Sequence, residues 1–218
     1  MRRPYFDRTA AGEVLADELG QVAGPVLVLG LARGGVPVGA PVADALDAEL
    51  DVLIVRKLGL PGQPELAMGA IAGVGEELHV VRNEPIAREV DEAVIEEVRQ
   101  REVRELRRRE SAYRGDRPPI DVRDRVVILV DDGLATGSTM RAAVEAVRRQ
   151  QPARVIVAVP VGGVESCRRL ARIADQVVCV WIPRYFTAVG QAYRDFSSVS
   201  DDEVQRVLAE STARRPGR

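Results

Sequence analysis

Short runs of leucine and β-branched residues alternate with helical patterns along this 218-residue chain, and this alternation limits the fold more than any other feature. Such runs are typical of strands that are buried on both faces of a parallel sheet. They lie at residues 26–31, 52–55, 126–130, 155–159 and 177–181. Helical patterns lie at residues 13–19, 36–46, 138–150 and 164–173. The order predicts an α/β fold with a doubly wound parallel sheet.

Residues 57–125 interrupt this alternation. A Gly/Pro-rich stretch at 58–64 predicts a loop, and strand-like pieces follow at 68–74 and 78–82. A long polar helix is expected at about 87–110, where pairs such as Glu105 and Arg109 would neutralise each other on a solvated face.

The C-terminal region begins a last helix at a capping box, in which Ser200 precedes Glu203 by three residues, and this helix is expected to run to about 209. We interpret residues 1–218 as a single domain. It carries an insertion with a flexible loop at about 57–125 and a small hood at about 181–218.

Composition excludes several classes of function. The net charge is −2, which favours neither nucleic acid nor a membrane surface as a partner. The N-terminal residues lack the apolar run of a signal peptide, and no apolar stretch reaches spanning length. Cys167 and Cys179 are the only cysteines, too few for a disulfide framework or a zinc site. We therefore expect a cytoplasmic protein.

The segment from 126 to 139 carries the most specific chemistry. A buried strand ends in two adjacent carboxylates, Asp131 and Asp132, which precede a loop of small residues and a helix that opens with hydroxyls. Backbone N–H groups at a helix N-terminus bind phosphate well. The residues expected to hold a phosphate are Ala135, Thr136, Gly137, Ser138 and Thr139. The alternatives are ordinary helix caps, or a nucleotide P-loop, which is excluded because no lysine follows the second glycine.

Two further segments point to anion binding. Arg33, Gly34 and Gly35 directly follow the first strand, and paired glycines let backbone N–H groups approach an anion closely. Lys57, the only lysine, ends the second strand beside the Gly/Pro-rich loop. If the first strand neighbours 126–130, both turns face one crevice at the carboxyl edge of the sheet. An ordinary strand–turn–helix connection and plain strand-end charges are the structural alternatives.

The segment 126–139 resembles the donor-binding motif of type I phosphoribosyltransferases, a hydrophobic strand followed by Asp-Asp and a Thr-Gly-Ser-Thr loop. The resemblance implies that Asp131 and Asp132 hold the ribose hydroxyls of 5-phosphoribosyl 1-pyrophosphate (PRPP) and that 135–139 hold its 5-phosphate. It also implies that 33–35 and Lys57 bind the pyrophosphate, with a cis Ala32–Arg33 peptide. Arg33, Lys57 and the two aspartates would then be the catalytic residues, with Lys57 carried by a loop that closes.

Five aromatic residues lie between 181 and 196, although aromatic residues make up only 4% of the chain. A flat heterocycle stacks well on such rings. The layout loosely resembles the base-binding hood of purine phosphoribosyltransferases, which implies Phe186 or Tyr185 as the stacking residue and Asp195 as a weak magnesium ligand. A packed aromatic cluster under the C-terminal helix is the structural alternative.

The family resemblance implies an enzyme that transfers the phosphoribosyl group to a nitrogenous base and releases pyrophosphate. Mg²⁺, held mainly by PRPP, is the implied cofactor, and a homodimer is expected. Ala135 stands where 6-oxopurine enzymes carry an aspartate near the base nitrogen, so a purine-like base other than hypoxanthine or guanine is favoured. A non-catalytic sensor that binds PRPP or a nucleotide is the competing interpretation.

Overall fold

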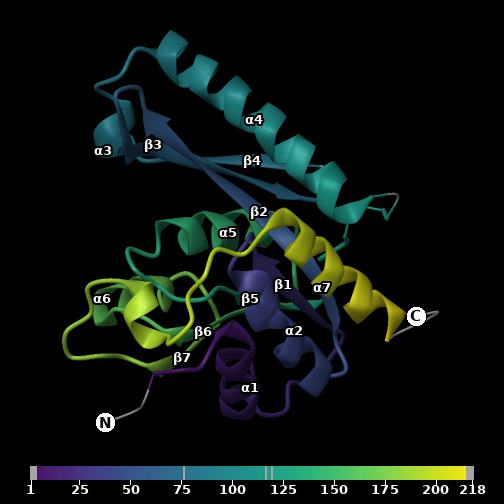
Figure 1. Ribbon diagram of the computed structural model, residues 1–218. Coiled ribbons are helices and arrows are strands. Elements are labelled where there is room, and N and C mark those ends of the chain that lie inside the picture. The colour runs from purple at the N-terminus through teal and green to yellow at the C-terminus, as the bar shows by residue number, and fades with distance from the viewer. Residues whose placement is uncertain (1–3, 76, 116, 119, 215–218) are drawn as a thin grey trace.

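The computed structural model describes residues 4–75, 77–115, 117–118 and 120–214. Within these residues the strands form one seven-stranded sheet in the order β4-β3-β2-β1-β5-β6-β7 (Figure 1). Five neighbouring strands are parallel, as the alternating pattern predicts. They are β1 (Val26–Leu31), β2 (Glu49–Leu60), β5 (Val126–Val130), β6 (Arg154–Val161) and β7 (Gln176–Trp181).

The insertion adds an antiparallel extension to this sheet. The second half of β2 pairs with β3 (Gln63–Val74), and β3 pairs with β4 (Glu77–Arg82). The prediction of a loop over 58–64 is therefore wrong except at a tight turn, because β2 continues to Leu60 and β3 begins at Gln63. Leu58 is 1% exposed, so the burial of this side chain favours strand pairing over the local Gly/Pro signal.

Helices cover both faces of the sheet, which explains why its central strands are apolar at every position. Side chains of α1 (Arg8–Leu19), α2 (Gly35–Ala45), α4 (Glu92–Arg114) and α7 (Asp201–Ala213) join one core cluster. Those of α5 (Ser138–Arg149) and α6 (Val164–Leu170) join a second cluster. Along β5, Ile128 faces the first cluster and Leu129 faces the second.

Caps set the helix ends that periodicity alone misplaces. The carboxylate of Asp7 accepts a hydrogen bond from the Ala10 N–H at 2.8 Å, so α1 begins at Arg8, earlier than predicted. Asp91 caps α4 in the same way, so α4 begins at Glu92, after a short helix α3 (Glu84–Ala87). Ser200 is confirmed as the N-cap of α7, since its hydroxyl accepts a hydrogen bond from the Glu203 N–H at 3.1 Å.

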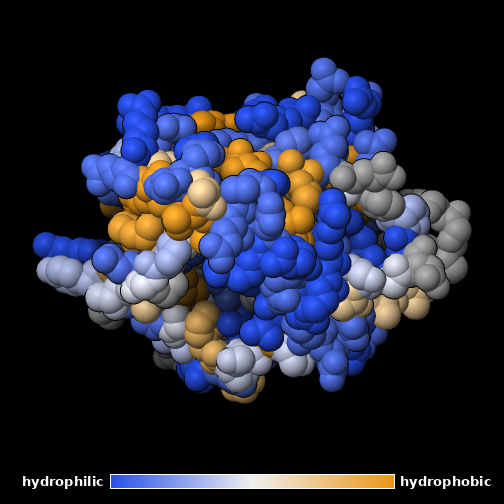
Figure 2. Space-filling view, turned by 90° about the horizontal axis from the view of Figure 1, so that it is seen from above, coloured by the Kyte–Doolittle hydropathy of each residue, from blue (hydrophilic) through white to orange (hydrophobic). Residues whose placement is uncertain are grey.

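The exposed side of α4 carries paired charges, as its sequence predicts. Glu105 contacts Arg109 at 2.8 Å and Arg108 at 2.8 Å, and these hydrogen bonds lower the pKa of Glu105 to about 2. In the view from above, hydrophilic side chains cover much of the surface, with a hydrophobic patch beside them (Figure 2). None of the described helices combines the length and apolar character that crossing a membrane requires.

Candidate active site

The carboxyl ends of β1 and β5 lie side by side, which brings the two predicted anion-binding turns to one edge of the sheet. Gly30 of β1 pairs with Val130 of β5 in parallel register. The turn after β1 packs tightly on the turn after β5, since a Cβ on Gly35 would collide with the Val130 carbonyl oxygen. The condition for one shared crevice, that these two strands are neighbours, is therefore met, and the glycine is needed for their close approach.

Asp131 and Asp132 are adjacent, partly buried carboxylates. Burial and the charge of Asp132 raise the pKa of Asp131 well above its ordinary value. Burial also raises the pKa of Asp132, while Arg8 opposes this shift. The Asp131 carboxylate accepts a hydrogen bond from the Asp132 N–H at 2.9 Å. The pair is thus a poorly solvated negative site that would gain from a ligand carrying hydroxyl donors or a cation.

The loop that follows the acid pair is anchored through its carbonyl groups. The Ser166 hydroxyl donates to the Ala135 carbonyl at 2.6 Å, and Arg169 donates to the Thr136 carbonyl at 3.1 Å. Gly137 has φ of +75°, a left-handed conformation that favours glycine, and directly precedes the first residue of α5. With its carbonyls engaged by α6, the loop can offer its N–H groups and hydroxyls to an anion.

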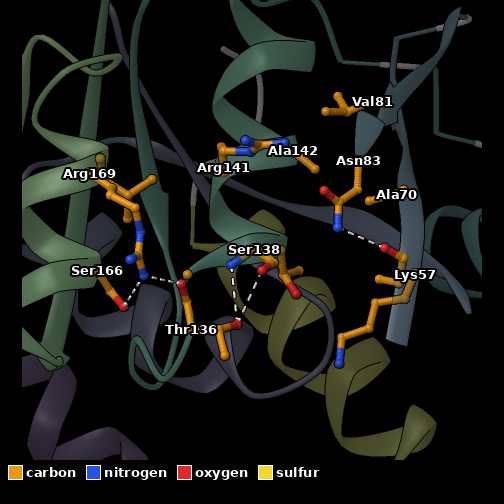
Figure 3. A pocket seen from close by; sticks show the side chains of 15 residues that line it. Lys57, Ala70, Val81, Asn83, Thr136, Ser138, Arg141, Ala142, Ser166 and Arg169 are labelled. Carbon is orange, nitrogen blue, oxygen red and sulfur yellow. Dashed lines mark hydrogen bonds between the residues drawn. The ribbon is translucent and has the colours of Figure 1, made fainter. Parts of the chain in front are cut away.

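A cavity of about 260 Å³ opens beside this loop. Lys57 reaches into it from β2, and the hydroxyl-bearing side chains of Thr136 and Ser138 lie between Lys57 and Arg169 (Figure 3). The structure therefore brings Lys57 together with the loop predicted to hold the 5-phosphate. Arg141 and Arg169 line the same cavity, and three cations with several hydroxyls suit a phosphorylated ligand.

Arg33 lies apart from the lining of that cavity. Its guanidinium is 3.7 Å from the Asp201 carboxylate at the start of α7. Asp201 also accepts a hydrogen bond from the Tyr113 hydroxyl at 2.6 Å, and burial together with this bond raises the pKa of Tyr113 to about 12. The Ala32–Arg33 peptide is cis, as the family resemblance implies. Gly34 lies against the Asp132 carboxylate, so the turn after β1 adjoins the acid pair.

The aromatic residues of the hood divide into two groups. Tyr193 stacks on Phe196 with ring centroids 5.0 Å apart and contacts Tyr5 at 5.7 Å, so these rings pack against the N-terminal segment. Tyr185 is 79% exposed, whereas Phe186 is partly buried and approaches Gly163, the N-cap of α6. The packed cluster thus exists beside the N-terminus. Of the two predicted base-stacking residues, Phe186 packs against this cluster, whereas Tyr185 lies outside it.

A magnesium ion would find carboxylates here but no complete set of protein ligands. Among the residues described, no three His, Cys, Asp or Glu side chains come together in a way that could hold a metal. Asp195 is exposed, and its carboxylate accepts a hydrogen bond from the Ser197 N–H at 3.0 Å. Mg²⁺ commonly binds one or two carboxylates together with substrate phosphates, so the donor set fits an ion carried by a phosphorylated ligand.

Sequence reasoning missed four residues of the site. Ser166 and Arg169 of α6 anchor the loop, Arg141 lines the cavity, and Arg8 of α1 contacts Asp132 at 2.9 Å. Asp7 is a local signal for the beginning of α1 and therefore for the position of Arg8 in the helix. No local signal connects Arg8 with Asp132. For the α6 residues, only their position after a parallel strand hints at the site.

An acid pair at the end of a central strand, followed by an anchored helix N-terminal loop and adjoined by an Arg-Gly-Gly turn, defines the type I phosphoribosyltransferase class. The family model for the phosphoribosyl transferase domain matches residues 9–186. The chain belongs to this family.

Relatives agree with this assignment. A Mycobacterium tuberculosis protein that is named as a phosphoribosyl transferase, Rv0571c, is 47% identical over 207 residues, 94% of this chain and 46% of that protein. The chain therefore spans about half the length of the curated relatives that it matches at this level. The crystal structure of TT1426 from Thermus thermophilus is 44% identical and has a TM-score of 0.80, and the match covers 96% of this chain and 99% of that chain.

Proposed function

We propose that this protein transfers the 5-phosphoribosyl group of PRPP to a ring nitrogen of a flat, purine-like base and releases pyrophosphate. The observation that carries the proposal is the cavity in which Lys57 faces the hydroxyls of Thr136 and Ser138, in the loop that begins with the acid pair. Membership of the phosphoribosyl transferase domain family makes a transferase the expected class of activity.

The residues act mainly by positioning and by electrostatics. The N–H groups and hydroxyls of residues 135–139 bind the 5-phosphate, while Asp131 and Asp132 accept hydrogen bonds from the ribose hydroxyls. Arg33, Gly34 and Gly35 bind the pyrophosphate from the turn after β1. Together these contacts fix the ribose ring while its bond to pyrophosphate breaks.

Lys57 contributes from the β2–β3 hairpin, whose movement toward the α5 N-terminus would close the cavity over the donor. Closure would exclude water, which otherwise hydrolyses the cationic ribose centre. Mg²⁺, held mainly by PRPP, would neutralise the negative charge on the pyrophosphate leaving group. The base would stack on Phe186 or Tyr185, with Asp195 as a weak magnesium ligand and a homodimer as the assembly.

The test supplies pure protein with PRPP, Mg²⁺ and one base at a time, and measures pyrophosphate release. Adenine and related flat heterocycles are compared with hypoxanthine and guanine, and we expect release only when an accepted base is present. The Asp131→Asn, Asp132→Asn double variant should lose Mg²⁺-dependent PRPP binding, measured by calorimetry. Arg206→Met, at an exposed pair on α7, is the matched control.

The outcomes separate the candidate functions. Turnover of hypoxanthine or guanine with a kcat/KM of about 10⁴ M⁻¹s⁻¹ or more would contradict the proposed base preference. Tight PRPP binding without turnover of any base would favour the sensor instead. Unchanged PRPP binding by the double aspartate variant would refute the assignment of the site.

A further inference from the structure

Arg8 makes several contacts close to the candidate site, and the proposed function assigns it no role. Its Nε donates to the Asp132 Oδ2 at 2.9 Å, and its Nη1 donates to the Ser197 carbonyl at 2.7 Å. The guanidinium also lies over the Phe196 ring, 4.1 Å from the ring centroid. The Arg8 side chain is 12% exposed and that of Asp132 is 16% exposed, so the ion pair is largely shielded from water.

Asp132 is held from further directions as well. The Tyr193 hydroxyl donates to the Asp132 backbone carbonyl at 2.6 Å. Gly34 leaves room for Oδ2, because a Cβ at this position would collide with that atom. The other carboxylate oxygen, Oδ1, accepts no hydrogen bond from any of the described residues. One oxygen is therefore fixed by Arg8, and the other is left for a ligand.

We infer that Arg8 is a positioning residue, which orients Asp132 so that Oδ1 meets a ribose hydroxyl while Oδ2 remains bound to the guanidinium. The inference rests on the proposed function, in which Asp132 binds the ribose. Arg8 makes no contact with the donor in this arrangement and acts only through Asp132. It connects the N-terminal helix, the hood and the acid pair in one unit.

The physical reason for this device is the concentration of negative charge. Asp131 and Asp132 are neighbours, and Asp195 is a third carboxylate that interacts electrostatically with Arg8. Two close carboxylates in a poorly solvated site favour sharing a proton. The protonated oxygen could then no longer accept a hydrogen bond from a ribose hydroxyl. Arg8 supplies a fixed cation with planar geometry, and Tyr193 adds a neutral donor to the main chain.

A double-mutant cycle tests the inference with PRPP and Mg²⁺ as the probe, read by calorimetry, with thermal unfolding as a check on folding. Arg8→Met should weaken PRPP binding by about 10- to 100-fold, the range for losing a charge-assisted hydrogen bond in a shielded site. Arg8→Lys should recover part of the loss, because lysine keeps the charge but cannot bridge Asp132 and Ser197. The exposed Arg206→Met should bind like the wild type.

The decisive comparison is made in the Asp132→Asn background. If Arg8 acts through Asp132, adding Arg8→Met to Asp132→Asn should change PRPP affinity by less than about threefold. An equal loss in both backgrounds, or wild-type affinity for Arg8→Met, would overturn the inference.

Two other results are also decisive. Should Arg8→Met fail to fold, Arg8→Lys carries the same cycle with the same criterion. Wild-type binding by Asp132→Asn would remove the proposed role of Asp132 and that of Arg8 with it, whereas loss with Asp132→Asn alone would overturn only the role of Arg8.

Discussion

Removal of the Ser166 hydroxyl tests whether α6 sets the conformation of the loop at 135–139, which we propose binds phosphate. Ser166 is 3% exposed, and its hydroxyl donates to the Ala135 carbonyl at 2.6 Å. The same oxygen lies 3.3 Å from a nitrogen of Arg169. Ser166→Ala therefore leaves a carbonyl without its donor and deprives the guanidinium of one acceptor, without adding bulk.

The expected magnitude follows from the burial of this bond. A buried polar group left unsatisfied costs about 1–3 kcal/mol, so the free energy of unfolding should fall by that amount. The freed loop must be ordered again when PRPP binds. If the whole of this cost appears in binding, the PRPP dissociation constant should rise by about 5- to 150-fold. Urea unfolding measures the first quantity, and calorimetry with PRPP and Mg²⁺ measures the second.

Ser111→Ala is the matched control, since Ser111 is an exposed serine on a helix remote in sequence from the loop. It should leave PRPP affinity unchanged. The reasoning is refuted if Ser166→Ala loses stability but binds PRPP like the wild type. In that case the backbone bonds of Leu134 to Val161 and Gly163 would suffice to hold the loop.

Three further predictions concern other parts of the site. The raised pKa of Asp131 means that just above pH 3.8 the free folded protein binds more protons than the unfolded chain, so its stability falls as pH rises through the raised pKa. Asp131→Asn should reduce this fall in urea unfolding across pH and leave the part that the raised pKa of Asp132 contributes, and an unchanged slope would contradict the prediction. Lys57→Met should lower kcat by about 10- to 100-fold with a smaller effect on PRPP affinity, and wild-type turnover would exclude a role in closure. Gly133→Ala would place a Cβ 2.6 Å from Val189 and should destabilise the fold by about 1–3 kcal/mol in thermal unfolding. An unchanged Tm would show that Val189 and the hood around it move to accommodate the methyl group.

The sequence by itself determined those features of the protein that a short stretch of consecutive residues specifies. Strands β1 and β5 begin and end at the predicted residues because their apolar runs are bounded by turn residues and acids. The parallel order of these strands followed from the alternation with helices, and so did the edge of the sheet at which the proposed anion-binding turns meet. The motif that follows β5 is contiguous, so its chemistry could be read before any contact was known.

Tertiary structure alone decided which distant residues complete the site. Asp132 meets Arg8 across 124 positions of the chain, and Ser166 reaches Ala135 across 31. Lys57 faces the proposed phosphate-binding loop because β2 extends past the parallel sheet into a hairpin. The burial of Leu58 favours this hairpin, although the glycines and prolines at 58–64 predict a loop. Such contacts depend on how whole helices and strands pack against one another. The sequence of either contacting segment shows no periodic pattern that would predict them.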